Sequence, residues 1–159
     1  MKPFEQSIVW YASDSNNIPH PSDFVMSGVT TGVAANKVVA TGLFPNTITF
    51  EPGDIICSDL DWLVAKVIRR ETDDELLLDT DIFSAPGNTF RIYRQNKGKP
   101  GTVYNTGGSA KDFTIQPVGF VDSNATAMLF TVQSNETLPM AVIKVLDTGT
   151  TLKKFTLLF

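Results

Sequence analysis

The sequence predicts an all-β fold of two small β-sandwich or β-barrel modules with an extended N-terminal arm. The chain has 159 residues, and 42 of them are Val, Ile or Thr against 10 Ala and 5 Glu, a composition that favours strands. Short apolar runs alternate with turn signals roughly every 8–12 residues. A polar linker at 95–101 contains two Gly and one Pro and indicates a boundary. We therefore expect an arm at 1–25, a first β module at 26–96 and a C-terminal β module at 97–159.

The arm begins with a strand candidate at 7–11, followed by a polar, proline-containing stretch. Such a stretch lacks the apolar residues that would let it fold alone. Trp10 and Tyr11 are ordered only if they dock on the rest of the chain or on a neighbouring subunit. Because aromatic anchors are frequent at interfaces, we treat both residues as interface candidates.

The first module has one ambiguous segment among several expected strands. Between residues 60 and 70 the apolar residues fit helical spacing, but they also alternate as in a strand. The strand signals on both sides favour a strand. The other strands expected in this module are bounded by Gly, Pro, Asn and Asp turns, and they cover residues 38–40, 47–50, 54–57, 75–78 and 90–93.

The C-terminal module is predicted to leave an apolar edge. Its expected strands cover residues 102–104, 113–118, 127–132, 140–146 and 155–159. A module of about 60 residues is near the lower limit for a self-sufficient core, and an open apolar edge is rarely tolerated. We therefore expect a homo-oligomer, or a monomer that becomes multimeric in an assembly, with Phe155 and Phe159 buried as further interface candidates.

The charge pattern excludes some partners. The net charge is −4; residues 1–96 carry 7 basic and 13 acidic side chains, whereas residues 97–159 carry 6 and 4. Opposite patches favour head-to-tail or side-by-side assembly, although such an asymmetry also arises by chance in a short chain. No basic cluster is long enough to neutralise several phosphates, so we expect no nucleic-acid partner.

Without an apolar run of membrane length or a signal leader, we expect a soluble protein that is not exported.

The sequence offers little material for catalysis. His20, the only histidine, lies between two prolines, and Cys57, the only cysteine, follows two isoleucines in an apolar run. One cysteine and one histidine exclude the usual structural zinc sites. Carboxylates, the ligand type that calcium prefers, lack the spacing of a calcium loop here, so solvated turns are the favoured interpretation. These residues are Asp59, Asp61, Asp73 to Glu75, Asp79 and Asp81. We expect no enzyme, with no catalytic residue, no cofactor and no metal.

The end of the chain carries the first resemblance to a known family. A Leu138-Pro139-Met140 start leads through an apolar strand to Thr148-Gly149-Thr150-Thr151 and a last strand that ends at Phe159. This resembles the closing signature of a family of tailed-phage virion proteins that includes head spike base proteins. The likeness is strongest over 138–159, where Phe159 stands in place of the family's usual Tyr.

The first half carries a second resemblance. Phe50, then Gly53-Asp54-Ile55, and later Asp81-Ile82-Phe83 are similar to a module that recurs in phage structural proteins. That likeness also implies a strand for the ambiguous segment.

The two resemblances imply a non-enzymatic structural protein of a tailed-phage virion. The implied role is a capsid decoration or cement protein, or a head spike-base protein, that binds the capsid surface. The implied partners are the major capsid protein or other virion proteins. The implied location is the capsid exterior, after synthesis in the host cytoplasm.

Two alternatives stay open. One is a neck, tail or fibre-attachment protein. The other is a carbohydrate-binding β-sandwich for host adhesion, which clustered exposed aromatic residues would support. Trp62 is expected in an apolar strand and Trp10 in the arm, so the sequence offers no such cluster.

Overall fold

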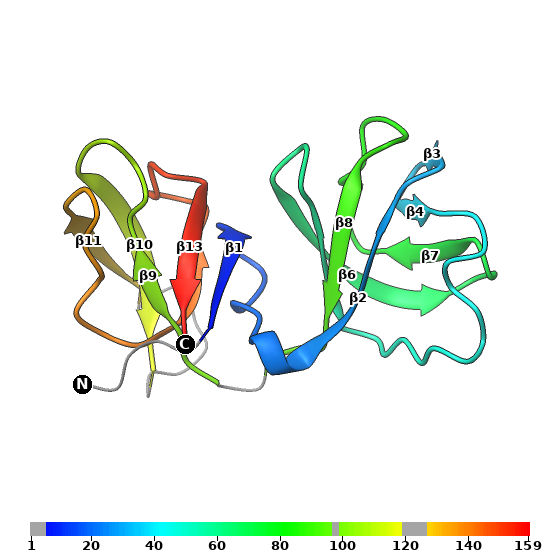
Figure 1. Ribbon diagram of the computed structural model, residues 1–159, viewed down its shortest axis with the longest axis horizontal. Helices are drawn as coiled ribbons and strands as arrows, with labels where there is room; N and C mark the ends of the chain where they lie inside the picture. The colour runs from blue at the N-terminus through cyan, green and yellow to red at the C-terminus, as the bar shows by residue number, and fades with distance from the viewer. Residues whose placement is uncertain (1–5, 97–98, 119–126) are drawn as a thin grey trace. The chain divides into compact units, whose positions relative to one another are not determined.

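The computed structural model describes residues 6–96, 99–118 and 127–159, which form thirteen strands and one short 3-10 helix, η1 (Pro21–Asp23) (Figure 1). Strands account for 45% of the chain and helix for 2%, so the predicted all-β class is confirmed. The chain divides into two compact units. We call residues 1–22 with 96–159 the terminal unit, and residues 23–95 the inserted unit.

The terminal unit contains two three-stranded antiparallel sheets. One has the strand order β1 (Ser7–Tyr11), β13 (Lys154–Leu158), β9 (Thr102–Tyr104). The other has the order β11 (Met128–Val132), β10 (Lys111–Pro117), β12 (Val142–Leu146). Phe113 on β10 and Phe155 on β13 meet edge to face with ring centroids 5.9 Å apart. These buried rings join the two sheets in one core.

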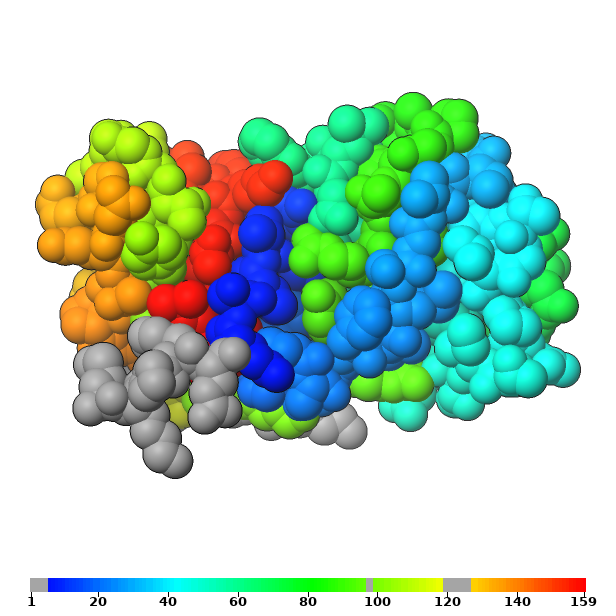
Figure 2. Space-filling model, viewed as in Figure 1, coloured from blue at the N-terminus to red at the C-terminus, as the bar shows by residue number. Residues whose placement is uncertain are grey.

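The N-terminal segment is not a separate arm. Its strand β1 pairs antiparallel with β13, from Ser7 opposite Leu158 to Tyr11 opposite Lys154, and Figure 2 shows the blue N-terminal segment against the red C-terminal strand. The reason is that β13 presents an edge that needs a partner. The first boundary therefore falls at 22/23 instead of 25/26, and the second, at 95/96, lies at the start of the predicted linker.

The inserted unit is built on one seven-stranded antiparallel sheet. Its strand order is β2 (Phe24–Val29), β8 (Thr89–Tyr93), β5 (Ile55–Ser58), β6 (Leu63–Arg70), β7 (Glu75–Leu78), β4 (Lys37–Val39), β3 (Gly32–Ala34). Only two residues, Thr30 and Thr31, separate the edge strands β2 and β3. A flat sheet would hold those edges about 29 Å apart at a strand spacing of about 4.8 Å. The sheet must therefore curl around its core, which includes Val38, Phe44, Ile56, Leu76, Phe90 and Ile92.

Individual strands of the inserted unit agree with the sequence only in part. The ambiguous segment is strand β6, as favoured. The strand expected at 47–50 is wrong, because this stretch forms turns, with the Ile48 amide donating to the Pro45 carbonyl at 3.0 Å. Phe50 instead packs its ring against buried Phe44, with centroids 5.6 Å apart. Strands β2 and β3 were not predicted.

Candidate binding site at the β5–β6 turn

Three large apolar side chains are exposed where β5 turns into β6. Leu60 is 62% exposed, Trp62 49% and Leu63 48%, and we call these three residues the apolar tip. A single exposed apolar residue needs no explanation, but a group of them marks a binding surface. In Figure 1 this turn leads directly into the strand labelled β6.

The turn itself is tightly hydrogen-bonded. The Trp62 amide donates to the Ser58 carbonyl at 3.0 Å, and the Asp61 amide donates to Ser58 Oγ at 3.1 Å. Trp62 has a φ of 57°, in the left-handed region that bulky residues rarely adopt. Such a conformation persists only where the surroundings enforce it, so the backbone bonds hold Trp62 in place.

A buried polar network supports the turn from beneath. Asn88, which is 1% exposed, donates from Nδ2 to Ser58 Oγ and to Asp61 Oδ2, both at 2.8 Å. Its Oδ1 accepts from the Leu60 amide at 3.2 Å. Its own amide donates to Thr30 Oγ1 at 3.0 Å. A buried side-chain amide destabilises the fold unless it is hydrogen-bonded. The hydrogen bonds of Asn88 connect the tip to the residue directly before strand β8 (Thr89–Tyr93).

Asp61 is the charged member of this network. Besides Asn88, it accepts from Ser58 Oγ at 3.1 Å and from Ser84 Oγ at 2.7 Å. Burial acts to raise the pKa of Asp61, but the hydrogen bonds from Ser84, Ser58 and Asn88 outweigh it and lower that pKa below the ordinary value. Asp61 is therefore ionised at neutral pH, and its hydrogen bonds hold the carboxylate in place.

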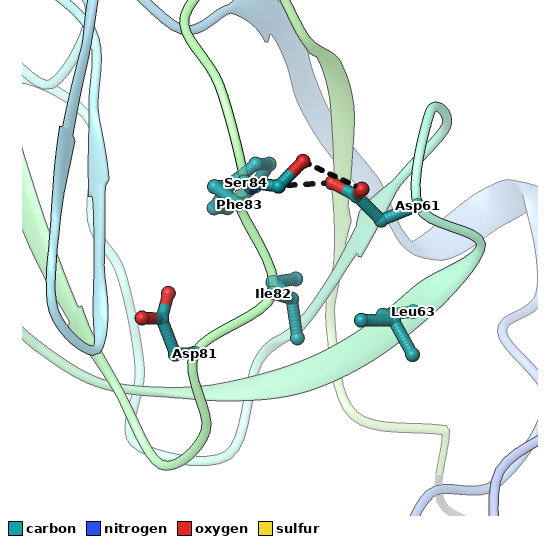
Figure 3. Close-up of a pocket in the computed structure, with 6 residues that line it drawn as sticks. All are labelled: Asp61, Leu63, Asp81, Ile82, Phe83 and Ser84. Carbon is teal, nitrogen blue, oxygen red and sulfur yellow. Dashed lines mark hydrogen bonds between the residues drawn. The ribbon is translucent and has the colours of Figure 1, made fainter.

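A pocket of about 240 Å³ lies beside the tip. Asp61 and Leu63 line it from the turn and the start of β6, and four residues that follow β7 complete it: Asp81, Ile82, Phe83 and Ser84. In Figure 3, Ser84 reaches Asp61 through the two hydrogen bonds drawn, while Asp81 lies on the other side of Ile82. The two carboxylates therefore do not converge on one point. The pocket has one carboxylate on each side of an apolar centre.

Next to the tip, Asp59 pairs with Arg91 at 2.6 Å, and the Cys57 thiol lies 3.8 Å from the same carboxylate. Cys57 is fully buried. Burial, more than any neighbouring charge, raises the pKa of its thiol to about 12. The thiol is therefore protonated at physiological pH and a poor nucleophile.

The interface candidates from the sequence lie elsewhere. Trp10, Tyr11 and Phe155 are at most 2% exposed and pack inside the terminal unit, so they offer no surface to a partner. Phe159 is half-buried, with its ring 4.9 Å from the His20 ring. A Cβ on Gly101 would lie 2.8 Å from the Phe159 ring, which shows how closely that ring is seated.

Sequence reasoning missed the apolar tip. Asp59 and Asp61 were assigned to a solvated turn, and the signal available was the Trp that follows directly after Asp61. An alternating pattern assigned Trp62 to the strand, whereas the strand begins one residue later.

Two further properties concern the part of the chain that is described. No three or more His, Cys, Asp or Glu side chains there come together in a way that would hold a metal ion. No helix in that part has the length and apolar character needed to cross a membrane.

Comparison with known proteins places the chain in no family. No protein-family model matches it, and no curated protein has a significantly similar sequence.

Proposed function

We propose that this chain is a non-enzymatic structural component of a tailed-phage virion that binds another virion protein through the apolar tip. The role that fits best is a capsid decoration or cement protein, or a head spike-base protein, seated on the capsid exterior. The resemblance of 138–159 to phage virion proteins supports the virion context. The proposed partner is the major capsid protein or a neighbouring virion protein, with assembly into homo-oligomers on the particle.

The observation that carries the binding role is the preorganised apolar tip. Leu60, Trp62 and Leu63 are held out by a turn whose polar groups are bonded beneath it. A rigid tip loses little conformational freedom on docking, which favours affinity. Trp in particular is enriched among interface residues that contribute about 2 kcal/mol or more.

The composition of the tip favours a protein partner over a saccharide. Trp62 is exposed, contrary to its expected place within a strand, which gives the carbohydrate hypothesis one aromatic platform. Its neighbours Leu60 and Leu63, however, are aliphatic. Aliphatic side chains around a Trp match the apolar centre of a protein–protein interface.

The test compares two leucines of nearly equal exposure. Leu60 on the tip is 62% exposed, and Leu129 on β11 of the terminal unit is 63% exposed. Leu60→Asp and Leu129→Asp chains are each produced together with the other virion proteins of the same phage. Purified particles are then assayed for the chain by quantitative mass spectrometry.

We expect the parent and the Leu129→Asp chain in the particles and a roughly tenfold or greater loss of the Leu60→Asp chain, since a central apolar anchor contributes about 2 kcal/mol. Solution melting of both variants checks that they stay folded. Absence of the parent from particles contradicts the proposal, and so does equal incorporation of a folded Leu60→Asp chain. Immunogold labelling of the particles separates the capsid from the neck and tail.

A further inference from the structure

We propose that the pocket beside the apolar tip receives a lysine or arginine side chain of the virion protein that the tip binds. The inference rests on the proposed function and adds the chemistry of the partner. It is carried by the pocket's size, by the arrangement of its charges and by the charge of the inserted unit.

The size of the pocket suits one side chain. Its volume of about 240 Å³ is below the ~300–1,000 Å³ typical of pockets for whole small-molecule ligands. It lies directly next to the tip, because Leu63 belongs to both. A protein segment that covers the tip therefore has a side chain within reach of the pocket.

The lining matches an amphipathic cation. Leu63, Ile82 and Phe83 form the apolar part, with Asp61 and Asp81 on either side of Ile82 (Figure 3). Lysine and arginine carry a charged head on an aliphatic stem, which packs on apolar surface while the head stays with the polar groups. Two carboxylates that do not converge suit such a side chain better than a single bare cation.

Asp81 is the carboxylate available to a partner. Asp61 is held by Ser58, Ser84 and Asn88. Asp81 is exposed, and within the described residues it makes no hydrogen bond or ion pair. Its negative charge is therefore not neutralised by any residue that the structure describes.

The charge of the unit favours a basic partner of another kind over a second copy. Residues 23–95 carry 6 basic and 11 acidic side chains, a net of −5. The terminal unit carries 7 basic and 6 acidic side chains, a net of +1. A second copy thus offers little complementary charge, whereas a basic surface on a different virion protein is attracted and steered to the pocket.

The first experiment titrates the isotope-labelled full chain with blocked single residues and follows backbone amides by NMR. The probes are N-acetyl-arginine methylamide and N-acetyl-lysine methylamide, with N-acetyl-norleucine methylamide as the neutral control. We expect saturable shifts at Leu63 and Ser84 for a basic probe in the millimolar range, and about twofold to fivefold weaker binding of norleucine, as one exposed ion pair provides.

Two charge-removing variants complete the test. Asp81→Asn is expected to weaken binding of the basic probe about twofold to fivefold. Glu51→Gln removes the same charge from an exposed site that precedes β5, at the opposite end of the strand from the tip, and is expected to bind like the parent. Absence of shifts at Leu63 and Ser84, equal binding of norleucine, or unchanged binding by Asp81→Asn overturns the inference.

The particle assay separates this inference from the proposed function. If Leu60→Asp is lost from particles while Asp81→Asn is retained at the parental level, the tip binds the virion and the basic side chain is refuted. If both are lost and Glu51→Gln is retained, both proposals are supported. Retention of a folded Leu60→Asp chain contradicts the proposed function itself. Stable self-association of the isolated chain that Asp81→Asn abolishes identifies a second copy as the occupant and overturns the choice of partner.

Discussion

At the scale of single residues, Asn88 connects the β5–β6 turn to the rest of the inserted unit. Its side chain contacts Ser58, Leu60 and Asp61 of the turn, and its backbone amide bonds Thr30 beyond β2. No other residue type offers two donors and an acceptor on one short, planar group of this shape. The exposure of the apolar tip therefore depends on a polar residue that is itself only 1% exposed.

Replacing Asn88 with Ala is expected to lower the free energy of unfolding by about 2–4 kcal/mol, because it removes three side-chain hydrogen bonds and leaves the Leu60 amide without its partner. Urea unfolding measures the change. Asn46→Ala is the matched control, since Asn46 is exposed in a turn and its loss is expected to change stability by less than about 0.5 kcal/mol. Equal stability of the two variants would refute the structural role of Asn88.

The carboxylate of Asp61 predicts a pH dependence of stability. Its pKa is lowered in the folded chain, chiefly by hydrogen bonds from Ser84 that overcome the effect of burial. Its contribution is therefore complete above the unfolded value of about 3.9 and is lost as pH falls through the lower, folded pKa. Asp54, whose pKa burial raises, acts in the opposite direction.

We expect the stability of the parent to fall more steeply on acidification than that of Asp61→Asn. Urea midpoints measured from about pH 6 to pH 2 test this, since the window starts above the unfolded pKa of about 3.9 and extends well below it. The Asn variant is less stable at pH 6, and the difference from the parent shrinks towards pH 2. A constant difference across the range would show that Asp61 contributes no ionised-state stability.

At the scale of elements, strand β1 is part of the core of the terminal unit. Trp10 is 1% exposed and Tyr11 2%, and the strand pairs along its length with β13. The Ala12 amide continues this pairing by donating to the Lys153 carbonyl at 3.0 Å. Removing β1 would leave β13 with an unpaired edge and open the core beneath Trp10.

Trp10→Ala is therefore expected to destabilise the chain by about 3–5 kcal/mol, the usual cost of deleting a buried large aromatic side chain. Val9→Ala on the same strand is the control, because Val9 is 38% exposed and its loss leaves a smaller cavity. Thermal melting compares the two. A Trp10→Ala chain that melts like the parent would restore the expectation of a detachable arm.

The same elements show what the sequence could predict. Strands β5, β7 and β8 were recognised because short apolar runs are bounded there by turn residues, and β6 was favoured because strands were expected on both sides of it. Strand β2 was missed because none of its residues is buried, so it lacks the apolar alternation that marks a strand. The pairing of β1 with β13 joins the two ends of the chain, and no local pattern encodes a partner so distant in sequence.

The candidate site could not be predicted from the sequence, because the exposure of its residues depends on a contact that is distant in sequence. Leu60 and Leu63 fit the apolar face of the helical pattern, and Leu63 also fits that of the strand pattern. Their exposure follows from the turn that Asn88 stabilises from a position 28 residues away. Trp10 and Phe155 were correctly recognised as anchors that need burial. Composition shows that such a residue needs burial. Only the tertiary pairing of strands decides whether the surface that buries it belongs to the same chain.

At the scale of the whole molecule, the inserted unit is a continuous segment placed between two parts of the terminal unit. Its entry and exit lie side by side, because Phe24 on β2 is opposite Tyr93 on β8 and the Arg94 amide donates to the Asp23 carbonyl at 2.7 Å. A domain whose ends meet can be inserted into another without disturbing either. The tip and the pocket both belong to this inserted unit.

We expect residues 23–95 to fold as an isolated fragment. The segment has a core of its own, centred on Phe44 and Phe90, and curling brings its two edge strands together instead of leaving them far apart. Chains of about 55–65 residues or more fold alone when they hold such a core. A dispersed amide NMR spectrum with a β-type circular dichroism signal and cooperative melting is the expected result.

A mutation within the fragment provides the control. Phe44→Ala removes a fully buried ring and is expected to lower the fragment's stability by about 3–5 kcal/mol, enough to unfold a small domain, while Val33→Ala at a 49% exposed position leaves it folded. If the wild-type fragment lacks amide dispersion at low temperature and gains it only within the full chain, the inserted unit is not autonomous. In that case the terminal unit would be needed to present the apolar tip, and mutations in its core such as Trp10→Ala would abolish binding together with folding.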